Sequence, residues 1–140
     1  MTVAVGVDLG STHCNVGIWR NSRPEIIANH HGLRSTPTMV AYADKEVLVG
    51  EAALTQIGKN QANTVYGFKW MVGVENANLE EHVKELIESA AFKVVAKEGG
   101  GPLVKVQVAG QDKEVTAEEL CIILFKHLRS IAEQFSGDKV

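Results

Sequence analysis

The sequence predicts an α/β protein, and three patterns indicate this class. Near the start of the chain Val3, Val5 and Val7 alternate with other residues, the period of two that is typical of a β-strand. Further along, apolar residues recur at helical spacing between residues 79 and 90 and again between 120 and 135. Strand patterns also lie between the two helices, so we expect antiparallel strands with helices packed against them.

Composition and charge narrow the class of protein. With 45% hydrophobic and 22% charged residues in 140 positions, the chain is typical of a globular protein with one core. A formal net charge of -3 offers no broad positive surface, so we expect neither nucleic acid nor a membrane as partner. Cys14 and Cys121 lie in apolar stretches without a secretory leader ahead of them, which predicts reduced thiols and a cytoplasmic protein.

The first elements are strands. The alternating valines predict a strand with Asp8 at its C-terminal end, on the face opposite the valines. Residues 14–20 and 24–28 predict two more strands joined by a turn at 21–23, and Thr38 to Tyr42 with Glu46 to Val49 predict a further pair. Together they indicate an antiparallel N-terminal meander.

Helices and a second group of strands follow. Residues 51–58 predict a short helix, and the repeat from Leu79 to Ala90 predicts a longer one. Residues 92–115 predict a hairpin with Val104, Val106 and Val108 on one face.

The last helix has the strongest signals. Thr116 and Glu119 form a capping box at its start, and Gly137 is placed to end it. Its predicted apolar face consists of Leu120, Leu124, Leu128, Ile131 and Phe135.

The turn after the first strand is the strongest candidate site. A tight turn directs successive backbone N–H groups to one point, and Gly10 lets an anion approach the main chain closely. Ser11 and Thr12 add hydroxyl donors. Asp8 would repel a phosphate unless a hydrated Mg²⁺ lay between them, so the pattern suggests magnesium-nucleotide binding. The alternative is an ordinary hairpin in which Asp8 only caps the turn.

Other candidate motifs are discounted. The pair Gly58 and Lys59 resembles the end of a phosphate-binding P-loop, but Ala53 and Asn60 stand where a glycine and a hydroxyl residue are required. The five histidines have no Cys or carboxylate partners at ligand spacing, so no structural metal is predicted.

Several blocks of the sequence resemble the seventy-kilodalton heat-shock protein family, the DnaK-like chaperones. These blocks, in chain order, are "VGVDLGSTHCNVGIW", "EIIANHHGLRSTPTMVAY", "VLVGEAA", "NTVYGFKWMVG" and "EELCIILFKHLRSIAEQF". They fall in the family's order and approximate spacing across nearly all 140 residues. Several colinear blocks are far more specific than one turn motif.

The resemblance implies a fold. Residues 1–140 would be the N-terminal lobe, cut short at Val140, of an actin-like (ribonuclease H-like) ATPase domain. We expect a mixed sheet with an antiparallel N-terminal meander and flanking helices. A small α+β subdomain would be inserted at approximately 34–115. The second lobe would lie beyond the chain, so we expect the isolated fragment to be an inactive monomer.

The resemblance also implies roles for individual residues. Lys69 and Asp8 would be catalytic: Lys69 would face the terminal phosphate, and Asp8 would hold Mg²⁺ through water. A lysine ammonium could stabilise charge on the transferring phosphoryl oxygens and orient the attacking water. The residues that would contact the phosphates of ATP or ADP are Gly10, Ser11, Thr12 and His13.

Four positions depart from the family pattern. Typical members have an acid where this chain has Gly67, arginines where it has Trp70 and Val74, and an aromatic where it has His13. The chain therefore resembles a divergent branch, and these losses affect hydrolysis more than fold.

The function implied by the resemblance is that of an ATP-dependent molecular chaperone. The whole protein would bind and hydrolyse ATP to control binding and release of unfolded polypeptides, with a J-domain co-chaperone and a nucleotide exchange factor as partners. Two alternatives stay open: a non-hydrolysing scaffold associated with the ribosome or a co-chaperone, and a sugar or acetate kinase of the same superfamily.

Overall fold

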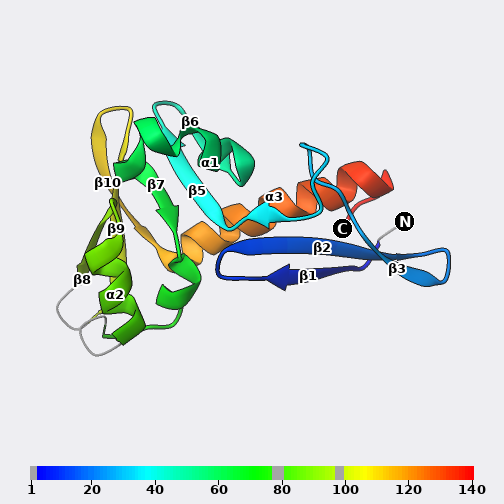
Figure 1. The fold of residues 1–140 in the computed structure, drawn as a ribbon, viewed down its shortest axis with the longest axis horizontal. Coiled ribbons are helices and arrows are strands. Elements are labelled where there is room, and N and C mark those ends of the chain that lie inside the picture. Colours follow the sequence, from blue (N-terminus) through cyan, green and yellow to red (C-terminus); the bar gives the residue numbers. More distant parts are fainter. Residues whose placement is uncertain (1–2, 77–80, 97–99) are drawn as a thin grey trace.

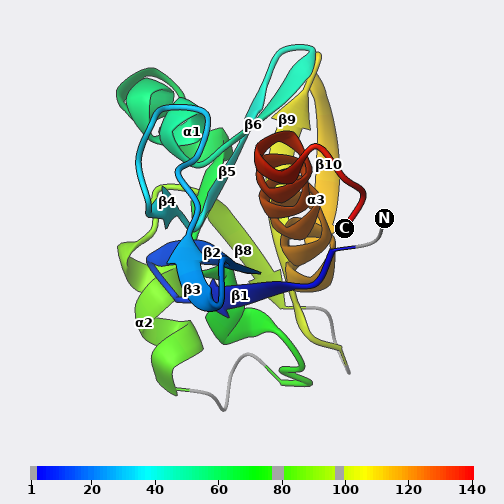
Figure 2. The same ribbon diagram turned by 90° about the vertical axis from the view of Figure 1, so that its right-hand side faces the viewer.

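A computed structural model describes residues 3–76, 81–96 and 100–140 of the chain. Figure 1 shows an elongated molecule with β1 to β3 at one end and β8 to β10 with α2 at the other. The long helix α3 runs beside β2 and reaches toward the middle of the molecule (Figures 1 and 2). Val3, the first described residue, lies beside the C-terminal end of the chain, where its backbone N–H donates to the Lys139 carbonyl oxygen at 3.0 Å.

The first sheet contains the predicted meander. Its strands are β1 (Val5–Leu9), β2 (His13–Arg20), β3 (Arg23–Ile26) and β4 (Thr36–Pro37), in the order β1-β2-β3 with β4 also paired to β2. The β2–β3 turn consists of Asn21 and Ser22 at positive φ, so Arg23 belongs to the strand and not to the turn as predicted.

A second sheet corrects the extent of that meander. Its strands are β5 (Met39–Ala43), β6 (Glu46–Val49) and β7 (Thr64–Tyr66), in the order β6-β5-β7. The predicted pairing of β5 with β6 is confirmed. The pair does not extend the first sheet, because β5 uses its other edge to pair with β7.

The third sheet has one strand more than the predicted hairpin. Its strands are β8 (Lys93–Ala96), β9 (Pro102–Val108) and β10 (Gln111–Thr116), in the order β10-β9-β8. Val104 and Val106 are buried on one face as predicted, whereas Val108 is half-buried at the strand end. Every strand pairing among the described residues is antiparallel, so the parallel pairings of the expected mixed sheet are absent from this part of the chain.

The helices follow the predicted pattern. The α-helices are α1 (Glu51–Gln56), α2 (Glu81–Ser89) and α3 (Ala117–Ser136), and the short 3-10 helices are η1 (Ile57–Lys59), η2 (Gln61–Asn63) and η3 (Phe68–Met71). Leu79, predicted to belong to the second helix, lies outside the described residues. None of the described helices combines the length and the apolar character needed to cross a membrane.

Helix α3 organises the core. Both hydrogen bonds of the Thr116–Glu119 capping box are present, and Gly137 ends the helix with φ 75°. The buried face of α3 packs near the buried side of β2, which consists of Cys14, Val16 and Ile18. The predicted face is confirmed from Leu120 to Ile131, but Phe135 is partly exposed beside the Arg20 guanidinium.

Candidate functional site

The β1–β2 turn is tight enough to require glycine at its first position. Residue pairing ends at Leu9 and Cys14, which leaves Gly10, Ser11 and Thr12 in the connection with His13 at the start of β2. A Cβ atom on Gly10 would collide with the His13 carbonyl oxygen. Glycine is therefore required at this position by the turn's own backbone, because His13 fills the space that a Cβ atom would take.

Hydrogen bonds from two buried residues, Thr38 and Cys14, fix the conformation of this turn. The Thr38 hydroxyl donates to the Gly10 carbonyl oxygen at 2.8 Å, and the Thr38 backbone N–H donates to the Thr12 carbonyl oxygen at 2.8 Å. Because the Thr38 hydrogen is used in this way, the Cys14 thiol is the donor in its 2.9 Å contact with Thr38 Oγ1. Burial raises the pKa of Cys14, so its thiol stays protonated and keeps donating.

Lys69 approaches the same turn from a distant part of the chain. Its Nζ donates to the Leu9 carbonyl oxygen at 2.7 Å, across 60 residues of sequence. The buried side chains of Phe68 and Met71 anchor η3, and through it the backbone of Lys69. The ammonium is thus positioned beside the residue that joins Asp8 to Gly10.

Gly67 explains one departure from the family pattern. It precedes η3 with φ 66°, and a Cβ atom there would lie 2.9 Å from Leu86 Cδ1 on α2. The left-handed backbone and the close leucine both favour glycine. The acid expected at this position is therefore absent for a structural reason.

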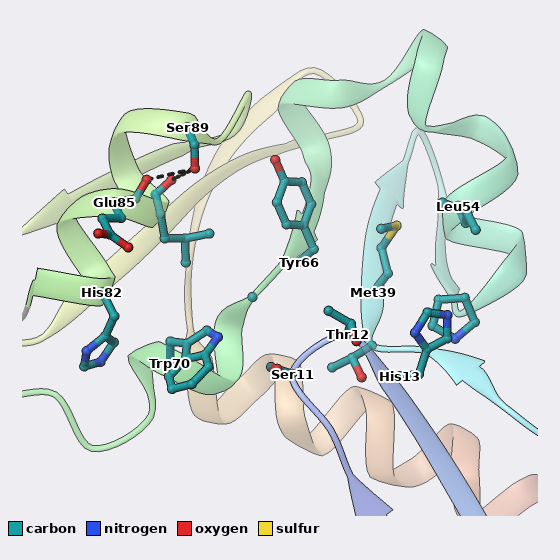
Figure 3. A pocket seen from close by; sticks show the side chains of 14 residues that line it. Ser11, Thr12, His13, Met39, Leu54, Tyr66, Trp70, His82, Glu85 and Ser89 are labelled. Carbon is teal, nitrogen blue, oxygen red and sulfur yellow. Dashed lines mark hydrogen bonds between the residues drawn. The ribbon is translucent and has the colours of Figure 1, made fainter.

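A cavity of about 540 Å³ opens beside the turn. Figure 3 shows Ser11 and Thr12 at its foot, Tyr66 opposite them, Trp70 and His82 on one side and Met39 and Leu54 on the other. Three of the four predicted phosphate-binding residues, Ser11, Thr12 and His13, line this cavity together.

Asp8 faces a different cavity, of about 680 Å³. As predicted, it lies on the sheet face opposite the buried side of β2, where Asn15 Nδ2 donates to its Oδ2 at 3.2 Å. This cavity is also lined by Arg23, Glu25 and Arg34. Asp8 and the Ser11–His13 group therefore lie on different sides of the turn and line different cavities.

Asp8 offers one carboxylate to a hydrated Mg²⁺, and Arg23 and Arg34, which line the same cavity, place positive charge near it. A carboxylate oxygen is a ligand that Mg²⁺ prefers, and Mg²⁺ usually keeps several waters. Among the described residues, no group of three or more His, Cys, Asp or Glu side chains could hold a metal ion alone. A magnesium ion at Asp8 would therefore take its other ligands from water and phosphate.

Thr38 and Asn29 both organise this region, and sequence reasoning missed Thr38. Asn29 is buried, and its Nδ2 donates to both carboxylate oxygens of Glu51 at 3.1 Å. Its Oδ1 accepts from the backbone N–H groups of His31 and Leu33 at 3.0 Å. In the sequence, an asparagine that precedes a glycine-containing loop indicates this structural role for Asn29. For Thr38, only the tertiary contact with the turn identifies it.

The fold and this turn define the class of protein: an α/β lobe of small antiparallel sheets that presents a glycine hairpin beside a cavity. The family model described as "Hsp70 protein" matches residues 4–140. The chain belongs to the Hsp70 protein family.

Curated relatives extend beyond the chain. It is 42% identical over all 140 residues to "Heat shock 70 kDa protein" of Ajellomyces capsulatus, and covers 19% of that protein. It is 39% identical over 138 residues (99% of the chain) to "Putative heat shock 70 kDa protein 7" of Homo sapiens, covering 37% of that protein. It is 36% identical over 138 residues (98% of the chain) to "Heat shock cognate 70 kDa protein 3" of Dictyostelium discoideum, covering 22%. The chain thus spans about a fifth to a third of these relatives.

Proposed function

We propose that the chain is the N-terminal ATPase lobe of a divergent Hsp70 chaperone. The whole protein would bind and hydrolyse ATP and so control the binding and release of unfolded polypeptides, together with a J-domain co-chaperone and a nucleotide exchange factor in the cytoplasm. The lobe would be actin-like, with residues 34–115 as its inserted subdomain. Family membership and the antiparallel α/β architecture support this proposal.

The observation that carries the proposal is the contact between Lys69 and the turn. Lys69 Nζ lies 2.7 Å from the Leu9 carbonyl oxygen, so a positive charge lies at the residue that precedes the turn. An ammonium has three donors, and only one is used for Leu9. The remaining donors would bind oxygens of the terminal phosphate and orient the attacking water.

The turn would bind the phosphates by its main chain and its hydroxyls. Ser11 and Thr12 would donate hydrogen bonds to phosphate oxygens, while Gly10 would leave the backbone N–H groups accessible. Asp8 would hold Mg²⁺ through water, and that ion would neutralise phosphate charge when bound. His13 lies at the cavity wall and would contact the same ligand.

Single-turnover hydrolysis in the full-length protein tests the proposal. Lys69→Ala should lower the rate by roughly a hundredfold or more and leave ATP affinity within a few-fold, because its contact strengthens as charge develops. Lys59→Ala, which removes an exposed lysine of η1, is the matched control and should leave the rate unchanged.

Two results would contradict the proposal. Hydrolysis by the Lys69→Ala protein at the parent rate would remove Lys69 from catalysis. Absence of hydrolysis in the parent itself would favour the scaffold alternative, which requires no turnover.

A further inference from the structure

The cavity beside the turn is larger and more apolar than phosphate groups require. Hydroxyl donors occupy its foot at Ser11 and Thr12, but its walls come from β5, α1, β7, η3 and α2 (Figure 3). Its volume of about 540 Å³ lies in the range of sites that enclose small organic molecules. The large apolar and aromatic residues of the walls are Met39, Leu54, Tyr66, Trp70 and Leu86.

Two aromatic side chains on these walls each contact a neighbouring ring. The Trp70 indole lies 5.4 Å from the His82 ring at a tilt of 56°, and half of Trp70 is exposed, so it can still contact a ligand. The Tyr66 ring packs edge-to-face on Phe92 with a centroid distance of 5.1 Å. Rings held in this way offer flat surfaces at little entropic cost, which favours a planar ligand.

The charge of the lining favours a cation. Glu85 on α2 is the only acid among the described residues that line the cavity, and His13 and His82 line it as well. The faces of Trp and Tyr rings attract positive charge as well. Lys69 is not among the lining residues, and its Nζ is hydrogen-bonded to the Leu9 carbonyl oxygen.

We propose that this cavity is a second ligand site, next to the phosphate turn, for a small planar aromatic molecule that carries a protonated amine. The ring binds between Trp70 and Tyr66, and the ammonium pairs with Glu85. Because Ser11 and Thr12 belong to the same lining, the ligand lies against the turn. The site goes beyond the proposed ATPase function, and its occupancy can be measured without nucleotide.

The two tryptophans of the chain provide the measurement. Each contributes one indole N–H resonance to a ¹H–¹⁵N NMR spectrum, and Trp19→Phe assigns them. Trp19 lies on β2, outside the cavity, and serves as the internal reference. The probes share one ring and differ in charge: tryptamine is cationic, 3-ethylindole is neutral and indole-3-acetate is anionic.

We expect tryptamine to shift the Trp70 resonance and leave Trp19 in place. Its dissociation constant should be roughly fivefold lower than that of 3-ethylindole, the size of one partly exposed cation–π or charge contact, with indole-3-acetate the weakest. Glu85→Gln should remove the preference for tryptamine. Glu88→Gln, an acid of the same helix outside the cavity, should preserve it. Trp70→Leu should weaken all three probes, and Trp70→Phe should retain part of the binding; in these two variants, which lack the Trp70 resonance, the backbone amide resonances of Ser11 and Thr12 in the lining report binding.

Three outcomes would overturn the proposal: no shift of Trp70 at millimolar tryptamine, equal affinity for the three probes, or the same loss in Glu88→Gln as in Glu85→Gln. None of them bears on the proposed ATPase function, because no arm of the experiment contains phosphate. Conversely, loss of hydrolysis in the full-length protein would leave this site unaffected.

Discussion

The hydroxyl of Thr38 donates a hydrogen bond of 2.8 Å to the carbonyl oxygen of Gly10, 28 residues earlier in the chain. The two residues belong to different parts of the fold: Gly10 lies in the β1–β2 turn, and Thr38 directly precedes β5. Since the Cys14 thiol donates in turn to Thr38, this hydroxyl connects the turn to the buried side of β2. The shape of the candidate phosphate site therefore depends on Thr38.

Thr38→Val should destabilise the protein by about 1–2 kcal/mol, because it keeps the shape of a buried side chain but leaves the Gly10 carbonyl oxygen without this donor. Urea unfolding followed by circular dichroism measures the change. Thr55→Val, at an exposed position of α1, is the control and should change stability by less than about 0.5 kcal/mol. Equal effects of the two substitutions would contradict the role given to Thr38.

Asp8→Asn should weaken nucleotide binding of the full-length protein by about tenfold or more in Mg²⁺, but only slightly in EDTA. The carboxylate charge matters for phosphate only when a cation lies between them. Titration calorimetry under both conditions provides the comparison. Glu25→Gln removes a carboxylate from the same cavity without altering β1, and should change affinity little in either condition. Equal losses with and without Mg²⁺ would instead indicate that Asp8 caps the turn.

Gly67→Ala should cost about 1–3 kcal/mol of stability. An L-residue at φ 66° is strained by roughly 1–2 kcal/mol, and its Cβ would also displace Leu86. Gly58→Ala provides the matched control, because a Cβ there has nothing within 4 Å and the backbone is not left-handed. Thermal unfolding of both variants tests this. A stability for Gly67→Ala equal to that of Gly58→Ala would show that neither the strain nor the contact matters.

Protonation of His127 should destabilise the fold at mildly acidic pH. Burial lowers the pKa of His127 below its ordinary value of 6.5, and the His30 ring, with its centroid 5.5 Å away, lowers it further, while Glu51 opposes both. The unfolded state then binds more protons than the folded state, so this contribution is complete above pH 6.5 and decreases as the pH falls toward the folded pKa. Urea unfolding at pH 7.5 and 5.5 should show a smaller loss for His127→Gln than for the parent. An unchanged pH dependence would assign the loss to other groups.

Signals that lie close together in the sequence made helix α3 and the β1–β2 hairpin predictable. The start and end of α3 follow from a capping box and a C-terminal glycine, both contained within a few residues of the helix. The β1–β2 hairpin follows from strict alternation around Gly10. In both cases the information that fixes the structure is close by in sequence.

Contacts between distant segments explain what was missed. The strands β5 and β6 form a separate sheet because β5 also pairs with β7, about 25 residues later in the chain. The sequence of β5 contains no signal that identifies β7 as its partner. Phe135 continues the apolar repeat of α3 but lies beyond the core, where the Arg20 guanidinium covers it. The walls of the Ser11–His13 cavity likewise include Trp70 and residues of α2. These residues lie beside the turn only in the tertiary structure.

The close approach of Gly67 to Leu86 has an evolutionary consequence. Because the backbone at position 67 is left-handed and Leu86 Cδ1 lies 2.9 Å from the place of a Cβ atom, an acidic residue cannot enter by a single mutation without strain. An acid at this position would strain the left-handed backbone before η3, whereas the end of the Leu86 side chain can move aside. Glycine is therefore expected to persist at position 67 in sequences that keep this backbone.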